Sequence, residues 1–165
     1  MGELVVAGVV MGLAGTVAMD LWGLLLERLC GIGRPNWAFV GRWVATLRSG
    51  RVFHDAIAGV PEVRGEAAIG WAFHYAVGVA YGLIWVLLAG RDWLAAPSFL
   101  PLWIFALVTV GAGWFLLHPG MGLGIAQSES ATPWRARGLG LVAHTVFGLG
   151  MWGGALAFIH GAGVA

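Results

Sequence analysis

The sequence predicts an all-α integral membrane protein with four transmembrane helices. Its 165 residues are 59% hydrophobic and only 10% charged, and the mean hydropathy is +0.85. Soluble domains carry about 25% charged residues, so a chain this apolar needs lipid as its solvent. The apolar runs long enough to cross a bilayer at about 20 residues each are 4–29, 67–89, 99–126 and 138–159. We expect one membrane domain, residues 1–165, with a long loop over 30–66.

The first run is expected to be a retained span. The N-terminus lacks a basic region, and no small-residue cleavage site leads into a polar mature domain, so a signal peptide is not indicated. The loop that follows is expected to hold a short interfacial helix, because Pro35-Asn36-Trp37 can open a helix. A helix packed under the bundle fits the same pattern. The apolar and basic positions fall on opposite sides of this helix: Trp37, Val40, Val44 and Leu47 against Arg42 and Arg48.

The arginines predict the orientation. Only Arg91 lies in the loop between the second and third spans. The other eight lie in or beside the first and third loops: Arg28, Arg34, Arg42, Arg48, Arg51, Arg64, Arg135 and Arg137. Because loops on the cytoplasmic side are enriched in Lys and Arg, we expect these two loops in the cytoplasm and both termini on the opposite side of the membrane.

Two spans carry the same spacing, Gly70-x-x-x-His74-x-x-x-Gly78 and Gly140-x-x-x-His144-x-x-x-Gly148. The other two spans match more weakly: aligning Gly15 with Gly113 places Asp20 on His118. This predicts a parallel repeat of a two-span unit, related by an axis along the membrane normal. Chance coincidence in a glycine-rich chain remains the alternative.

Four ionisable residues are expected at one depth. At about 1.5 Å of rise per residue, each lies roughly 10–13 Å inside the cytoplasmic end of its span: Asp20, His74, His118 and His144. Ionisable residues inside a membrane face the bundle interior and pair with one another. Pro119 is expected to kink the third span just below His118, and the glycines at 120, 122 and 124 favour an opened helix.

This predicted layer has three functional interpretations. His74 and His144 could be axial ligands of haem b, with Gly70, Gly78, Gly140 and Gly148 giving a flat cofactor close approach. All four side chains could instead hold one transition metal, with His54 and Asp55 as further ligands. A proton or ion relay is the third interpretation. A structural Asp–His network, with glycines that only pack helices, is the alternative without a ligand.

Catalysis is not indicated. The chain has no Gly-x-Ser-x-Gly, no His-Glu-x-x-His, no phosphate loop and no paired carboxylates, and no aromatic-basic pattern suggests nucleic acid. The leading hypothesis is therefore binding of haem b or a transition metal for electron transfer or metal handling. The alternatives are an accessory subunit of a larger membrane complex and a small transporter that works as a homo-oligomer.

Several stretches of the chain form a recognisable set: Met19-Asp20-Leu21-Trp22, Val40-Gly41-Arg42-Trp43, His54-Asp55, Gly70-Trp71-Ala72-Phe73-His74-Tyr75, Gly120-Met121-Gly122-Leu123-Gly124 and Ala143-His144-Thr145-Val146-Phe147-Gly148. With these stretches the chain resembles a family of small bacterial inner-membrane proteins, domain of unknown function 2938. The resemblance covers nearly the whole chain. It implies a bacterial multi-pass membrane protein and assigns no catalytic or binding residue.

Overall fold

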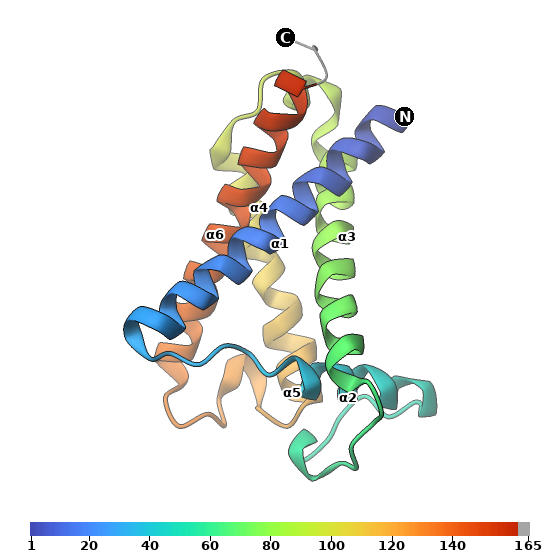
Figure 1. Cartoon of the computed structure of the whole chain (residues 1–165), viewed down its shortest axis with the longest axis vertical. Coiled ribbons are helices and arrows are strands. Elements are labelled where there is room, and N and C mark those ends of the chain that lie inside the picture. Colours follow the sequence, from blue (N-terminus) through green and yellow to red (C-terminus); the bar gives the residue numbers. More distant parts are fainter. Residues whose placement is uncertain (162–165) are drawn as a thin grey trace. The chain divides into compact units, whose positions relative to one another are not determined.

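The computed structural model describes residues 1–161, and this part of the chain is helical without a strand (Figure 1). The elements in chain order are α1 (Gly2–Cys30), α2 (Trp37–Thr46), η1 (Leu47–Ser49), η2 (Ile57–Gly59), α3 (Glu66–Ala95), α4 (Phe99–Ala112), η3 (Gly113–Leu117), α5 (His118–Gly120), η4 (Ile125–Gln127) and α6 (Pro133–Gly161). Four segments are long and apolar enough to span a membrane: Gly2–Cys30, Glu66–Ala95, Phe99–Gly120 and Pro133–Gly161. The predicted fold class of four transmembrane helices is confirmed.

The third span is shorter than the apolar run that predicted it. The helix ends at Gly120, not at position 126, because glycines with positive φ follow at Gly122 and Gly124. Just before its end the helix widens into the π-helical turn η3, which directly precedes His118. The opening expected at the glycines is present at Gly122 and Gly124. The distortion of the helix itself lies before Pro119, in the π-helical turn, and the kink expected just below His118 stays a prediction.

The chain divides into two compact units. The first contains residues 1–34, 75–109 and 142–165, and the second contains 35–74 and 110–141. Each unit has a buried apolar cluster of its own.

The first unit is built on a glycine-rich face of α1. A Cβ atom added to Gly12 would fall on the Gly78 carbonyl of α3 and lie 2.6 Å from Val79 Cα. Gly8 meets Gly82 in the same way one turn earlier. Small residues let membrane helices approach until their backbones touch, so this face of α1 can hold nothing larger. The buried cluster comprises Ala7, Met11, Trp85, Val86, Leu94, Leu102, Ala106, Phe147, Met151, Ala155 and Ile159.

The last glycine of each predicted motif packs against the span that precedes it. A Cβ on Gly78 would lie 3.3 Å from the Gly12 carbonyl in α1, and one on Gly148 would lie 3.0 Å from Ala106 Cβ in α4. The alignment of Gly15 with Gly113 makes Gly12 equivalent to Val110, so Ala106 lies one helical turn before the expected position. The two helix pairs share a mode of packing but not a register, and duplication stays a prediction.

The second unit places a short helix against the start of α3. Asn36 caps α2 by accepting a hydrogen bond from Ala38 N at 3.0 Å, so the predicted helix in the first loop is confirmed. A Cβ on Gly41 would fall on the Glu66 carbonyl, and one on Gly70 would fall on the Trp37 carbonyl. The two helices therefore meet backbone to backbone, and α2 is covered by protein along this face.

The apolar cluster of the second unit fills the space between α2 and the loops. Its buried members are Val40, Trp43, Ile57 and Met121. Arg42 is buried as well, with only 4% of it exposed. The side of α2 that carries Arg42 meets Glu66, the first residue of α3, and the sequence did not indicate this acidic partner.

Candidate functional site

In the first unit, Asp20 of α1 is paired with Tyr75 of α3. The Tyr75 hydroxyl donates a hydrogen bond to Asp20 Oδ2 at 2.9 Å. An ionisable side chain within a membrane span is costly unless it has a partner, and this hydroxyl supplies one. Sequence reasoning missed Tyr75, although its position next to His74 is the signal that could have indicated it.

His144 of α6 is anchored to α4 by one ring nitrogen. Its Nδ1 lies 3.1 Å from the Ala106 carbonyl and 3.0 Å from Thr109 Oγ1. The Thr109 hydroxyl itself lies 2.7 Å from the same carbonyl. A carbonyl only accepts, so this arrangement places the ring proton on Nδ1 and the lone pair on Nε2. Histidines that bind metals are commonly oriented in this way.

In the second unit, His74 lies against tryptophan rings. Its imidazole stacks on the Trp37 indole at 4.0 Å between centroids with an interplanar angle of 28°. Trp71 approaches the same ring edge-on at 5.9 Å. Trp37 is the first residue of α2, so His74 takes part in the packing of α2 on α3.

His118 lies where the third span ends, and one of its ring nitrogens has no partner. Its Nε2 lies 3.0 Å from the Gln127 side-chain nitrogen. Its Nδ1 is buried and makes no hydrogen bond within residues 1–161. The π-helical turn that precedes it is a feature found frequently at functional sites.

His54 is the second imidazole of this unit with a buried nitrogen that lacks a partner. Only 6% of the residue is exposed, and its Nδ1 lies 3.0 Å from the Gly120 carbonyl. Since the carbonyl accepts, Nδ1 carries the proton and Nε2 carries the lone pair. His54 Nε2 is buried without a hydrogen bond in the described chain. Both histidines are thus attached to one short segment, since Gly120 follows His118 by two residues.

The chain beyond this segment is strained. Ala126 and Gln127 have φ angles of 50° and 58°, and they are the only residues other than glycine with positive φ in the described part of the chain. This conformation costs an alanine or a glutamine roughly 1–2 kcal/mol. Backbone strain of this kind clusters at functional sites. Here it holds the Gln127 side chain against His118.

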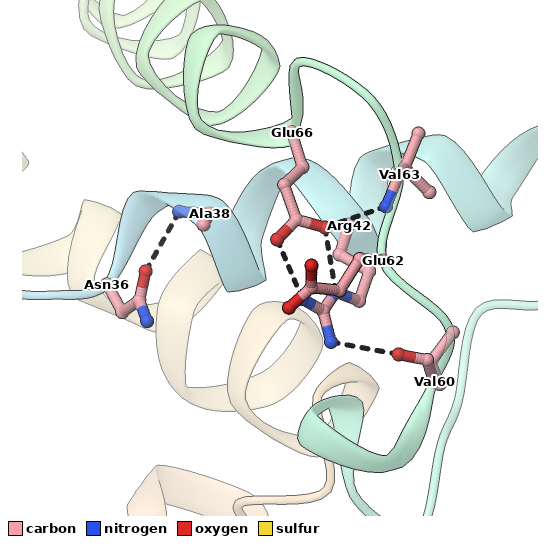
Figure 2. Close-up of polar contacts among 7 residues, drawn as sticks. All are labelled: Asn36, Ala38, Arg42, Val60, Glu62, Val63 and Glu66. Carbon is pink, nitrogen blue, oxygen red and sulfur yellow. Dashed lines mark hydrogen bonds and ion pairs between the residues drawn. The ribbon is translucent and has the colours of Figure 1, made fainter.

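A part-buried ion pair between Arg42 and Glu66 fixes the loop that leads into α3 (Figure 2). Arg42 Nε and Nη2 lie 2.8 and 2.7 Å from the two carboxylate oxygens of Glu66, and Nη1 donates to the Val60 carbonyl at 2.8 Å. Glu62 lies further away, at 3.5 Å, and is exposed. The hydrogen bonds that Arg42 donates to Glu66 raise the pKa of Arg42 above its usual range. Arg42 therefore stays charged, and each of its three guanidinium nitrogens has a partner in the protein.

The glycines that flank His74 and His144 lie against protein atoms. The space beside Gly70 and Gly78 is filled by the Trp37 carbonyl and by Thr16 Oγ1. Gly148 faces Ala106, and Gly140 faces Trp114 Nε1 at 3.8 Å. Close packing accounts for Gly70, Gly78 and Gly148, as expected for small residues in membrane proteins, whereas Gly140 has only an ordinary van der Waals contact.

The predicted layer falls into both units. Asp20 and His144 belong to the first unit, whereas His74 and His118 belong to the second. Between residues 1 and 161 no three His, Cys, Asp or Glu side chains form a group that could hold a metal ion. Asp55 is exposed. The haem pair and the four-residue metal site stay predictions, whereas His54 and His118 each have a buried ring nitrogen without a hydrogen bond in the described chain.

Comparison with known proteins gives the family. No curated protein and no solved structure matches the chain. Residues 9–158 match the model of a family described as protein of unknown function, DUF2938. The match agrees with the motifs that carry the resemblance and includes most of the first and last spans and all of the other two. The chain therefore belongs to the DUF2938 family.

Proposed function

We propose that this DUF2938 protein binds a transition-metal ion through His54 and His118. The observation that carries the proposal is the pair of buried ring nitrogens without partners, His54 Nε2 and His118 Nδ1. A buried polar atom without a hydrogen bond costs about 1–3 kcal/mol, and a metal ion is a partner that imidazole accepts readily. The Gly120 carbonyl orients His54 as backbone carbonyls orient metal-binding histidines.

Gln127 decides which nitrogen of His118 can act as a ligand. Its amide N–H can donate to Nε2, which leaves the ring proton on Nδ1. With the amide turned over, its oxygen accepts from Nε2–H, and the lone pair is then on Nδ1. Metal binding would select the second arrangement, because only a nitrogen without a proton binds a metal. Gln127 is therefore a positioning residue in this proposal.

Metal content tests the proposal directly. The full chain, purified in detergent and stripped with a chelator, is titrated with Zn²⁺, Ni²⁺ and Cu⁺, and the bound metal is counted by elemental analysis. We expect about one ion per chain, and loss of at least tenfold in affinity for His54→Gln and for His118→Gln. The control is His160→Gln, because His160 is exposed and bonded to Leu156 O at 2.7 Å. Metal-free protein, or affinity unchanged in both variants, would refute the proposal.

The haem alternative has its own readout. If His74 and His144 are axial ligands of haem b, the purified protein has a Soret band that His74→Ala and His144→Ala abolish. A colourless preparation with bound metal favours His54 and His118. A colourless, metal-free protein that copurifies with a fixed partner favours the accessory subunit. Uptake of a substrate into vesicles that contain the purified protein favours the transporter.

We further propose the bacterial inner membrane as the location, with loops 30–66 and 127–137 in the cytoplasm. Eight of the nine arginines lie in or beside these loops, and positive loops stay on the cytoplasmic side. Cys30 is exposed, so a membrane-impermeant maleimide should not label it in intact spheroplasts. The matched control is Cys30→Ser with Ser98→Cys, which moves the thiol to the second loop and should be labelled. The reverse pattern would invert the orientation.

A further inference from the structure

The first turn of α6 exposes an aromatic ring beside two arginines. Trp134 is 80% exposed, more than any other large hydrophobic residue in the described chain, and Arg135 is exposed as well. The helix that begins here at Pro133 is one of those able to span a membrane. An indole this exposed is unfavourable in water but well suited to the polar boundary of a bilayer.

Arg137 is held in place without an acidic partner. Its Nε donates to the Ala126 carbonyl at 2.9 Å, and its guanidinium carbon lies 4.6 Å from the centroid of the Trp134 ring. Within residues 1–161 it forms no ion pair. The guanidinium is thus fixed by a carbonyl and an indole, both of which leave its charge unneutralised.

The local charge favours an anion. No acidic residue lies in the first turn of α6. Between positions 125 and 141 the only acid is Glu129, against Arg135 and Arg137. The carbonyl that anchors Arg137 belongs to Ala126, which is one of the two residues other than glycine with positive φ in the described chain.

We propose that Trp134, Arg135 and Arg137 form a docking surface for the headgroups of acidic phospholipids. The planar guanidinium matches the geometry of a phosphate group, and its orientation is fixed before the lipid binds, which lowers the entropy lost on binding. The indole lies at the headgroup level beside it. Each arginine near an acidic surface should strengthen binding by about fivefold.

Lipid binding to the full chain tests this surface. Native mass spectrometry of the detergent-solubilised protein counts bound phosphatidylglycerol and phosphatidylcholine at equal concentrations. We expect phosphatidylglycerol to bind at least about fivefold more tightly, and Arg137→Gln and Arg135→Gln each to reduce that preference. Within residues 1–161 Arg135 has no side-chain hydrogen bond or ion pair to lose, so its variant keeps the test valid if Arg137→Gln disturbs the fold.

The matched control is Arg91→Gln. Arg91 belongs to the first unit, away from the proposed surface in sequence. Its side chain is 63% exposed and lies 3.7 Å from Glu3 of the same unit. Its loss should leave the lipid preference unchanged. Equal binding of the two lipids, or a preference that Arg91→Gln lowers as much as Arg135→Gln does, would overturn the proposal. So would tighter capture of an acidic protein or RNA by the same arginines than of the lipid.

Discussion

Arg42 and Glu66 form a two-pronged ion pair that ties the middle of α2 to the first residue of α3, with nitrogen–oxygen distances of 2.8 and 2.7 Å. Their side chains are only 4% and 13% exposed. Removing one member of such a pair leaves an uncompensated charge in a place with little water. We therefore expect the pair to stabilise the docking of α2 on α3.

The first prediction is that Arg42→Met lowers the Tm by about 5 °C or more, as measured by tryptophan fluorescence in detergent. The control is Arg34→Gln, because Arg34 and Glu27 pair at 2.8 Å but are 45% and 40% exposed. Exposed pairs contribute little, so this control should shift the Tm by about 1 °C or less. Equal effects of the two variants would show that the Arg42 pair is not structural.

The second prediction concerns the packing of α1 on α3. Gly12→Ala places a methyl group on the Gly78 carbonyl, so we expect a loss of about 1–3 kcal/mol in the free energy of unfolding. Gly138→Ala is the matched control, because nothing lies within 4 Å of a Cβ added there. It should be neutral, or stabilising by up to about 1 kcal/mol in a helix. A tolerated Gly12→Ala would mean that the two helices are further apart than described.

Gly78→Ala separates packing from cofactor binding at the predicted motif. Its new methyl group would meet Thr16 Oγ1, so we predict that the Tm of the ligand-free protein falls by several degrees, about as far as for Gly12→Ala. A glycine needed only for a bound macrocycle would leave the Tm of the ligand-free protein unchanged. Thermal melts of colourless, ligand-free protein therefore distinguish the two roles.

The spans could be predicted from sequence because composition alone specifies them. An apolar run such as 4–29 needs no knowledge of its neighbours, and the structure extends it only to Gly2–Cys30. The end of the third span was less predictable, since residues 121–126 are apolar enough to continue it. What stops the helix is backbone conformation at Gly122 and Gly124, which hydropathy does not record.

The candidate site was only partly predictable for a related reason. Helical spacing gives the direction of the Arg42 side chain on α2, but it does not reveal the partner, Glu66, which lies 24 residues later in the sequence. His54 could be named as an ionisable residue, whereas its partner is a backbone carbonyl 66 residues away. Positive φ at Ala126 leaves no mark in the sequence. Partners that are set by tertiary contact, not by periodicity, were the ones missed.

Strain at Ala126 gives the fourth prediction. Ala126→Gly removes the steric cost of a φ angle of 50°, so we expect stability to rise by up to about 1 kcal/mol. Ala136→Gly lies within helix α6 and should lower stability by about 1 kcal/mol. If the strain positions Gln127 for metal binding, Ala126→Gly also weakens metal affinity while the Tm rises. The expected result is a change in Tm of opposite sign for the two variants, a rise for Ala126→Gly and a fall for Ala136→Gly.

The fifth prediction addresses Asp20 and Tyr75. Tyr75→Phe removes the hydroxyl that donates to Asp20 Oδ2 at 2.9 Å, and a hydrogen bond to a charged group contributes about 1.5–3 kcal/mol. The control is Tyr81→Phe, whose ring packs against Phe105 and Phe147 and should retain that packing without the hydroxyl. We expect Tyr75→Phe to lower the Tm and Tyr81→Phe to leave it nearly unchanged.

A double-mutant cycle with Asp20→Asn isolates the pair. If the hydroxyl acts through the carboxylate, Tyr75→Phe costs less in the Asp20→Asn background than in the wild type, and the difference is the coupling energy between the two side chains. Strict additivity would mean that Tyr75 stabilises the first unit by packing alone. In that case the carboxylate of Asp20 draws its stabilisation from other groups, and its pairing with Tyr75 is incidental.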